Sequence, residues 1–258
     1  MNRLTRKLEN FAPLSNDDKR FLDDVTRAPH EVAARTNLVR QGDAPDHVHL
    51  ILDGFACRHK LTSEGMRHIM AYLVPGDFCD LHVLILKTMD HNIGTLSPCR
   101  VVKIPGSRIL EMTERPALAR ALWWATLVDE AVLREWLVNI GQREAPERVA
   151  HILCELLLRL RAVGLADGDS YELPITQEEL GDTLGLSTVH VNRTLQALRA
   201  ENLITLKSGH VVIIDEARLF EFSGFNPNYL HLPTGAAAIR IRTSLRQLRL
   251  GPGLITSS

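Results

Sequence analysis

Short strand-like runs separated by glycine-marked turns make up the first part of the chain, after a short helix predicted from Ser15 to Val25. The turns recur at spacings of 12, 11 and 11 residues, at Gly42, Gly54, Gly65 and Gly76. Between them lie apolar runs of strand length, such as Val48 to Leu52 and His68 to Val74. Turns at this regular spacing favour an antiparallel β-barrel or jelly roll.

From Pro116 to about Gly141, the apolar residues recur at the spacing of an α-helix. Its large apolar residues fall on more than one side of the predicted helix, at Leu118, Leu122, Trp124, Leu127, Val128, Val132, Trp136 and Ile140. A single buried face does not require so many, so we predict that this helix packs on its own β-roll and on a second copy of the chain. The predicted seam of this homodimer consists of Leu118, Leu122, Val128, Val132 and Trp136. A helix buried inside one large domain is the alternative.

Proline marks the boundary between the long helix and the C-terminal part of the chain. Pro146 cannot continue the preceding helix and suits the first turn of the next one, predicted from Glu147 to Val163. We expect a hinge near residues 142–146 and a polar loop over residues 164–171.

The stretch from Thr176 to Arg199 predicts two short helices joined by a tight turn. Thr176 and Glu179 have the spacing of a capping box, which starts the first helix. Gly185 falls where the chain reverses direction in a left-handed conformation, and Ser187 caps the second helix.

The second of these helices has two different faces. Val191, Leu195 and Leu198 share one side and are expected to pack on the first helix. The opposite side carries Val189, Asn192, Arg193 and Gln196. Such a face suits the major groove of DNA, because arginine bridges guanine, amides bridge adenine, and an apolar group meets the thymine methyl. The alternative is an ordinary helical domain in which Val189 is one exposed apolar residue.

A β-hairpin is predicted directly after this unit. Two apolar runs, Leu203 to Leu206 and Val211 to Ile214, flank a turn at Lys207-Ser208-Gly209 and would form the wing of a winged helix. The turn-like segment Asn226 to Tyr229 could pack on this wing.

The segment from Gln177 to Leu195 resembles the helix-turn-helix of the Crp/Fnr transcription regulators. The matching positions are Gly181, Gly185, Ser187, Val191, Arg193 and Leu195. The earlier segment is similar to the cyclic-nucleotide-binding type of β-roll in the same family, at Arg40-Gln41-Gly42-Asp43, Asp53-Gly54 and Pro75-Gly76-Asp77-Phe78. The resemblance covers roughly residues 10–230.

The resemblance and the outward helix face together indicate which residues would bind DNA. We expect base contacts from Thr188, Val189, Asn192 and Arg193. We expect phosphate contacts or positioning roles for Thr176, Gln177, Ser187, His190, Gln196, Lys207 and Ser208. The implied partners are double-stranded DNA with a palindromic operator, a second copy of the chain and RNA polymerase.

The β-roll departs from the family members that bind cyclic AMP. Those carry a Gly-Glu pair after the glycine turn and an arginine, followed by serine or threonine, that binds the cyclic phosphate. The corresponding stretches here are Cys79-Asp80-Leu81-His82 and Asp90 to Thr95, and no arginine lies between Arg67 and Arg100. A buried phosphate without a guanidinium partner would be poorly held, so cyclic AMP is not the expected ligand.

No other cofactor is predicted, and the identity of the effector stays open. Oxygen-sensing members of the family bind an iron-sulfur cluster through cysteines near the N-terminus, whereas the first cysteine here is Cys57. His82 and His91 flank the apolar run Val83 to Leu86 and could ligate a haem iron or another metal. A single histidine is more often structural, so we predict no metal site. The β-roll could also hold a dimer that is always competent for DNA binding.

Composition and charge limit the functional classes to which the chain can belong. The chain has 258 residues, 45% of them hydrophobic, and a formal net charge of -1, so it has no bulk attraction to polyanions. The helix-turn-helix and wing hold three basic residues against Glu178, Glu179, Asp182 and Glu201. The cysteines at 57, 79, 99 and 154 form no C-x-x-C pair, which favours reduced buried thiols. The sequence shows no bilayer-spanning run and no signal-peptide core, so we expect a cytoplasmic protein.

These features predict an α+β chain with an N-terminal antiparallel β-roll (jelly roll), a long dimerisation helix and a C-terminal winged helix-turn-helix. The predicted boundaries are 1–115 for the sensor, 116–145 for the dimerisation helix and hinge, 146–232 for the DNA-binding domain, and 233–258 for a basic tail. The tail could touch phosphates, but we expect it to be disordered. The predicted function is transcription regulation without cyclic AMP. The alternatives are a sensor that acts through a protein partner and, ranked last, a cupin-type enzyme, for which clustered metal ligands are missing.

Overall fold

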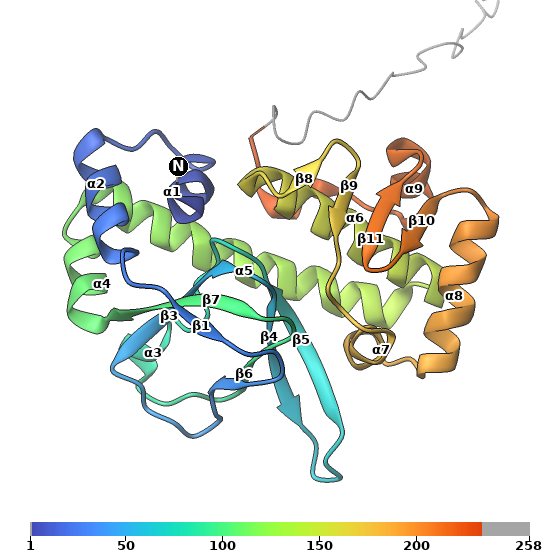
Figure 1. Ribbon diagram of the computed structural model, residues 1–258, viewed down its shortest axis with the longest axis horizontal. Helices are drawn as coiled ribbons and strands as arrows, with labels where there is room; N and C mark the ends of the chain where they lie inside the picture. Colours follow the sequence, from blue (N-terminus) through green and yellow to red (C-terminus); the bar gives the residue numbers. More distant parts are fainter. Residues whose placement is uncertain (1, 234–258) are drawn as a thin grey trace, which may run out of the picture.

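Two antiparallel sheets form the N-terminal half of the computed structural model, which describes residues 2–233 (Figure 1). One sheet has the strand order β1-β7-β3, and the other has the order β2-β6-β4-β5. The strands are β1 (His30–Val32), β2 (Asn37–Val39), β3 (His47–Asp53), β4 (Ala56–Leu61), β5 (Arg67–Leu73), β6 (Asn92–Thr95) and β7 (Cys99–Pro105). In β7, Arg100 and Lys103 point outward between buried neighbours, as in a half-buried strand. The predicted jelly roll is confirmed.

Short helices surround this β-roll: α1 (Arg3–Glu9), α2 (Asn16–Val25), α3 (Val83–Leu86) and α4 (Gly106–Thr113). The predicted cap of α2 is confirmed, because the Ser15 hydroxyl accepts a hydrogen bond from the Asp18 backbone N–H at 3.1 Å. Helix α1 was not predicted, although it buries Leu4 and Leu8 against the β-roll core.

Helix α5 (Pro116–Gln142) runs for 27 residues between the β-roll and the C-terminal half (Figure 1). The dimer seam predicted on it is wrong in detail. Leu118 and Leu122 are buried in the core of the β-roll, whereas Val132 and Trp136 are buried with α6 (Ala145–Val163), and Val128 packs partly buried beside them. The apolar pattern correctly indicated two packing sides, but it could not show which of them faces the protein's own chain.

The C-terminal half is built around α6, whose residues from Val149 to Leu158 are all buried. Around it lie β8 (Ala166–Asp167), β9 (Ser170–Glu172), α7 (Gln177–Leu184), α8 (Thr188–Ala200), β10 (Ile204–Lys207), β11 (His210–Ile213), α9 (Glu216–Ser223) and the 3₁₀ helix η1 (Pro227–Leu230). The predicted wing is β10–β11, and it extends into a four-stranded sheet of order β10-β11-β9-β8.

Two local predictions in this half are wrong. Residues 164–171 are not a simple polar loop, because they contain β8 and most of β9, and Tyr171 is buried within the core. The segment from Asn226 to Tyr229 does not pack on the wing. It contacts α5, and the Tyr229 hydroxyl donates a hydrogen bond to Glu155 of α6 at 2.9 Å. The tail arginines Arg240, Arg242, Arg246 and Arg249 lie outside the described residues.

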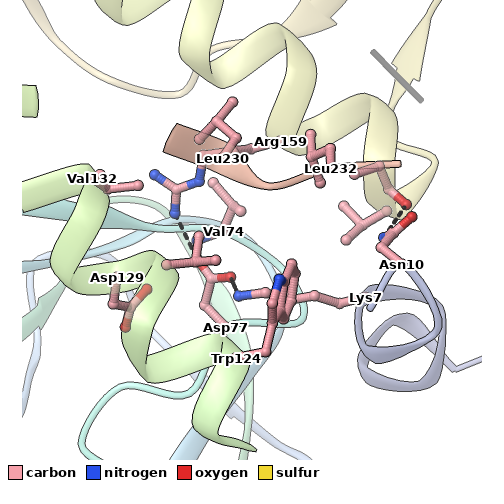
Figure 2. Close-up of a pocket in the computed structure, with 13 residues that line it drawn as sticks. Lys7, Asn10, Val74, Asp77, Trp124, Asp129, Val132, Arg159, Leu230 and Leu232 are labelled. Atoms are coloured by element: carbon pink, nitrogen blue, oxygen red, sulfur yellow. Dashed lines mark hydrogen bonds and ion pairs between the residues drawn. The ribbon is translucent and has the colours of Figure 1, made fainter. Parts of the chain in front are cut away.

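Buried charges connect the two halves of the molecule (Figure 2). Asp77 of the β-roll pairs with Lys7 of α1 and, at 2.8 Å, with Arg159 of α6. Arg159 also donates to Glu155 at 2.9 Å, and Glu155 in turn accepts a hydrogen bond from the Trp136 indole at 2.9 Å. These five side chains come from four separate parts of the chain, so the network fixes the β-roll half against α5 and α6. No helix in the described part of the chain is long and apolar enough to cross a membrane.

Candidate nucleic-acid interface

The capping box predicted for α7 is confirmed. The Thr176 hydroxyl accepts a hydrogen bond from the Glu179 backbone N–H at 3.2 Å, and the Glu179 carboxylate accepts one from the Thr176 N–H at 2.8 Å. These two bonds satisfy backbone donors that the start of a helix leaves without partners. Thr176 is exposed and Gln177 is partly exposed at this helix start, so both remain accessible.

The turn between α7 and α8 depends on two glycines. Gly185 ends α7 with φ of 66°, the left-handed conformation expected there. Gly181 lies inside α7, where a Cβ atom would come within 2.4 Å of the Leu186 carbonyl oxygen. A side chain at position 181 would therefore push the turn away from α7 and change the angle at which α8 leaves it.

The two faces of α8 are divided as predicted. Val191, Leu195 and Leu198 are at most 1% exposed, whereas Val189 is 64% exposed. The outward surface also contains Thr188, His190, Arg193 and Gln196, all of them exposed. Ser187 caps the helix by accepting a hydrogen bond from the His190 backbone N–H at 3.3 Å.

The Asn192 side chain is less exposed than its neighbours on the outward face of α8, and a hydrogen bond restrains it. It is partly buried, and its amide donates a hydrogen bond to the Gln177 side chain at 3.2 Å. This bond joins the outward face of α8 to the start of α7, so Gln177 can hold the Asn192 amide in one orientation. The carbonyl oxygen of Asn192 is not used by this bond.

A surface hollow of about 430 Å³ lies beside the start of α8. It brings together four of the predicted residues: Ser187, Val189, His190 and Arg193. Pro146, from the start of α6, also lines the hollow and was not predicted. Its position depends on the packing of α6 against α8, for which the local sequence pattern contains no signal.

The tip of the wing presents the two remaining predicted residues. Lys207 pairs in register with His210, and Ser208 and Gly209 between them have φ of 50° and 81°. Positive φ at both central residues matches the two-residue hairpin turn that fits the twist of the strands. Lys207 and Ser208 are exposed there.

The surface of the helix-turn-helix is less acidic than its sequence suggests. The Glu179 side chain is 3% exposed, and its carboxylate is used in the capping box. Asp182 is paired with Arg67 of β5 at 2.7 Å. Two of the four carboxylates between Thr176 and Lys207 are therefore engaged inside the protein, which leaves Glu178 and Glu201 as the exposed ones. The Arg67–Asp182 pair also joins the β2-β6-β4-β5 sheet directly to α7.

Each half of the chain matches the model of a known domain family. Residues 29–115 match the model of the cyclic nucleotide-binding domain, and residues 147–222 match that of the Crp-like helix-turn-helix domain. The nitrogen fixation regulation protein FixK of Bradyrhizobium diazoefficiens is 31% identical over 174 residues, which cover 66% of this chain and 70% of that protein. The chain belongs to the Crp/Fnr family of transcription regulators. The transcriptional activator protein FnrL of Cereibacter sphaeroides is 29% identical over 196 residues, covering 74% of this chain and 78% of FnrL.

The fold of this Crp/Fnr regulator matches solved structures. FixK2 from Bradyrhizobium japonicum superposes with a TM-score of 0.67 at 23% identity, covering 76% of this chain and 96% of that one. The regulator TTHB099 from Thermus thermophilus superposes with a TM-score of 0.57 at 19% identity, covering 76% of this chain and 96% of that one. Family membership confirms the prediction of a transcription regulator rather than an enzyme.

The Crp/Fnr regulator has a hollow of about 370 Å³ between its β-roll and α5. Contrary to the sequence argument, this hollow does contain a guanidinium, that of Arg58 from β4. Arg58 is already bonded, however, to the carbonyl oxygens of Cys79 at 3.0 Å and Phe78 at 3.1 Å, and to the Asp129 carboxylate at 2.9 Å. A cyclic phosphate would have to compete with Asp129 for this charge.

The cysteines of this Crp/Fnr regulator do not fit an iron-sulfur cluster. All four are buried, and burial raises the pKa of Cys57 to about 12 and that of Cys99 to about 11. The ligands of a cluster are thiolates, whereas these environments favour the protonated thiol. Within residues 2–233, the only group of His, Cys, Asp and Glu side chains close enough to share a metal ion contains no cysteine.

Proposed function

We propose that the chain binds a two-fold symmetric DNA operator as a homodimer and regulates transcription there, with one α8 in the major groove of each half-site. The observation that carries this proposal is the outward face of α8, where Val189 and Arg193 project into solvent beside the capped turn. A helix-turn-helix with this exposure can place base-contacting side chains in a groove about 12 Å wide.

The dimer surface that we propose is the exposed apolar stripe of α5. Its members project from a helix whose other sides are already buried: Trp123 at 78% exposed, Leu127 at 58%, Leu133 at 46%, Leu137 at 67% and Val138 at 46%. Glu130 and Arg134 lie along the same stripe and form an ion pair at 2.8 Å. A contiguous apolar stripe on one helix is typical of a helix-helix interface.

The remaining elements of the proposal concern regulation. We propose that residues 1–115 form the sensor, 116–145 the dimerisation helix and hinge, and 146–232 the DNA-binding domain. The pairing of Arg58 with Asp129 in the sensor hollow supports independence from cyclic AMP, and the burial of the thiols supports independence from an iron-sulfur cluster. The proposed setting is the cytoplasm, where RNA polymerase would be the further partner.

Salt-dependent binding to duplex DNA tests this function. Each phosphate contact should contribute about 0.9 to the slope of log affinity against log salt concentration, because counterions are released. Lys207→Ala should lower that slope by about one contact, since Lys207 is exposed at the tip of the wing. The matched control is Lys60→Ala on β4, whose lysine lies in the sensor half and should not change the slope. Salt-independent or absent duplex binding by the purified protein would favour a sensor that acts through a protein partner.

A further inference from the structure

Three potential metal ligands converge at the sensor hollow between the β-roll and α5. His82 precedes α3, and Asp90 and His91 precede β6. The imidazole ring centroids of His82 and His91 lie 5.3 Å apart. One ligand atom from each of the three side chains lies within 4.8 Å of the other two.

The histidines at this place have nitrogen atoms without hydrogen-bond partners. The Nε2 atoms of His82 and His91 are both buried and make no hydrogen bond. His91 is only 7% exposed, so water does not readily compensate for the missing bond. Buried polar atoms are nearly always bonded, and a bound ion is one explanation for an exception.

Asp90 determines which nitrogen of His91 is free. Its carboxylate lies 2.6 Å from Nδ1 of His91. Because a carboxylate only accepts hydrogen bonds, Nδ1 carries the proton and the lone pair is left on Nε2. Metal-binding histidines in proteins are commonly oriented by a carboxylate in this way.

We propose that His82 and His91 bind one divalent transition-metal ion, of which Zn²⁺ is the representative, through their Nε2 atoms at the mouth of the sensor hollow. In this site Asp90 orients His91 from its Nδ1 side. Imidazole nitrogens are ligands that Zn²⁺ and its neighbours in the first transition row accept, with bonds of about 2.0–2.1 Å to zinc.

Other charged side chains that line the hollow are already paired. Arg58 and Asp129 neutralise each other at 2.9 Å, and Glu130 is paired with Arg134 at 2.8 Å. The two histidines would leave further coordination positions of the ion to water or to a small ligand. Thr126 and Leu133 of α5 line the same hollow, so a bound ion would lie beside the helix that carries the proposed dimer stripe. This last connection rests on the proposed function, whereas metal binding does not.

Titration of the full-length, chelator-treated protein with Co²⁺ tests the site, because cobalt reports its coordination by visible absorption. We expect one ion per chain, displacement by Zn²⁺, and a melting temperature that rises with ion concentration. His82→Gln and His91→Gln should each weaken binding at least tenfold, and Asp90→Ala should weaken it on the order of 10–100-fold. His231→Gln is the matched control, since His231 is exposed and lies outside the site.

If a histidine variant does not fold, Asp90→Ala still tests metal binding. The Asp90 side chain is 73% exposed, so its removal should disturb the packing of the protein little. Absence of binding at millimolar Co²⁺ and Zn²⁺, or binding that the three site variants leave unchanged, would overturn the proposal. The titration contains no DNA, so its outcome is independent of whether the protein binds an operator.

Discussion

Arg159 of α6 and Asp77 of the β-roll form an ion pair at 2.8 Å, and their side chains are only 13% and 3% exposed. Asp77 belongs to the Pro75-Gly76-Asp77-Phe78 turn of the sensor, whereas α6 supports the helix-turn-helix. The sensor and the DNA-binding half are therefore held together by a buried charge pair with strict geometry. Lys7 adds a second cation to the same carboxylate.

Replacing Asp77 with asparagine should destabilise the folded chain by about 3–5 kcal/mol, because Lys7 would remain largely buried without a counter-charge and Arg159 would keep only its pair with Glu155. Burial alone raises the pKa of Asp77, but the charges of Lys7 and Arg159 outweigh it and hold the pKa below its usual value. The folded-state pKa is thus lower than the unfolded value of about 3.9, so this stabilisation is present above about pH 4. It should disappear as the pH falls through the folded-state pKa.

Denaturant unfolding of the wild type and of Asp77→Asn between pH 3 and pH 7 measures this effect. The control is Asp53→Asn, which removes an ion pair to Arg3 whose carboxylate is 55% exposed and should cost less than about 1 kcal/mol. Equal losses of unfolding free energy in the two variants at pH 7 would contradict the structural importance of Asp77.

The α5 stripe should control oligomeric state. The double substitution Leu127→Glu and Leu137→Glu places two carboxylates on the exposed apolar surface and should convert a dimer to a monomer. DNA affinity should then fall on the order of 100-fold, since the two half-sites are no longer bound together. Light scattering after size exclusion gives the mass, and Leu61→Glu on the exposed tip of β4 serves as the control. A wild type that is already monomeric, or a double variant that stays dimeric, would refute this interface.

Val189 should determine one base preference in each half-site. A carboxylate at this position can accept a hydrogen bond from the cytosine amine, which valine cannot. Val189→Glu should therefore shift the selected base pair at that position towards one that presents cytosine to α8. Because Val189 is 64% exposed, stability should change by no more than about 0.5 kcal/mol. Val189→Ala, which stays apolar, should retain the wild-type preference, and identical selection profiles for all three proteins would remove Val189 from the interface.

Cyclic AMP should have no effect on the protein. A ligand that binds the folded form raises its melting temperature, and a ligand linked to DNA binding changes DNA affinity. With Arg58 bonded to Asp129, we expect saturating cyclic AMP to change neither quantity. A rise in melting temperature that is abolished by substitutions between Gly76 and Thr95 would reverse this conclusion.

The features that sequence predicted correctly depend on neighbouring residues. The caps at Ser15 and Thr176, the turn at Gly185 and the buried side of α8 each follow from residues within a few positions of one another. The side of α5 that packs on its own chain could not be predicted in the same way, because Trp136 and Trp123 are equally apolar. Only the position of α6 and Tyr72 decides that Trp136 is buried, with its ring 5.4 Å from that of Tyr72, while Trp123 is exposed.

The sequence pattern also could not predict contacts between segments that are far apart in the chain. Arg58 reaches Asp129 across 71 positions, and Arg67 reaches Asp182 across 115, so no local pattern pairs them. In the sequence, His82 and His91 stand as separate single histidines. The backbone reverses after α3, where Lys87 has φ of 66°, and this reversal brings the two rings together.

Selection of bound duplexes from a random DNA pool by the purified protein tests DNA recognition through α8 most directly. We expect enrichment of a two-fold symmetric sequence whose half-sites are about one DNA turn apart. We also expect that Arg193→Ala loses on the order of 1–3 kcal/mol of discrimination at one guanine-containing base pair per half-site. No enrichment over the starting pool, or the same enriched sequence and discrimination for wild type and Arg193→Ala, would contradict DNA recognition through α8.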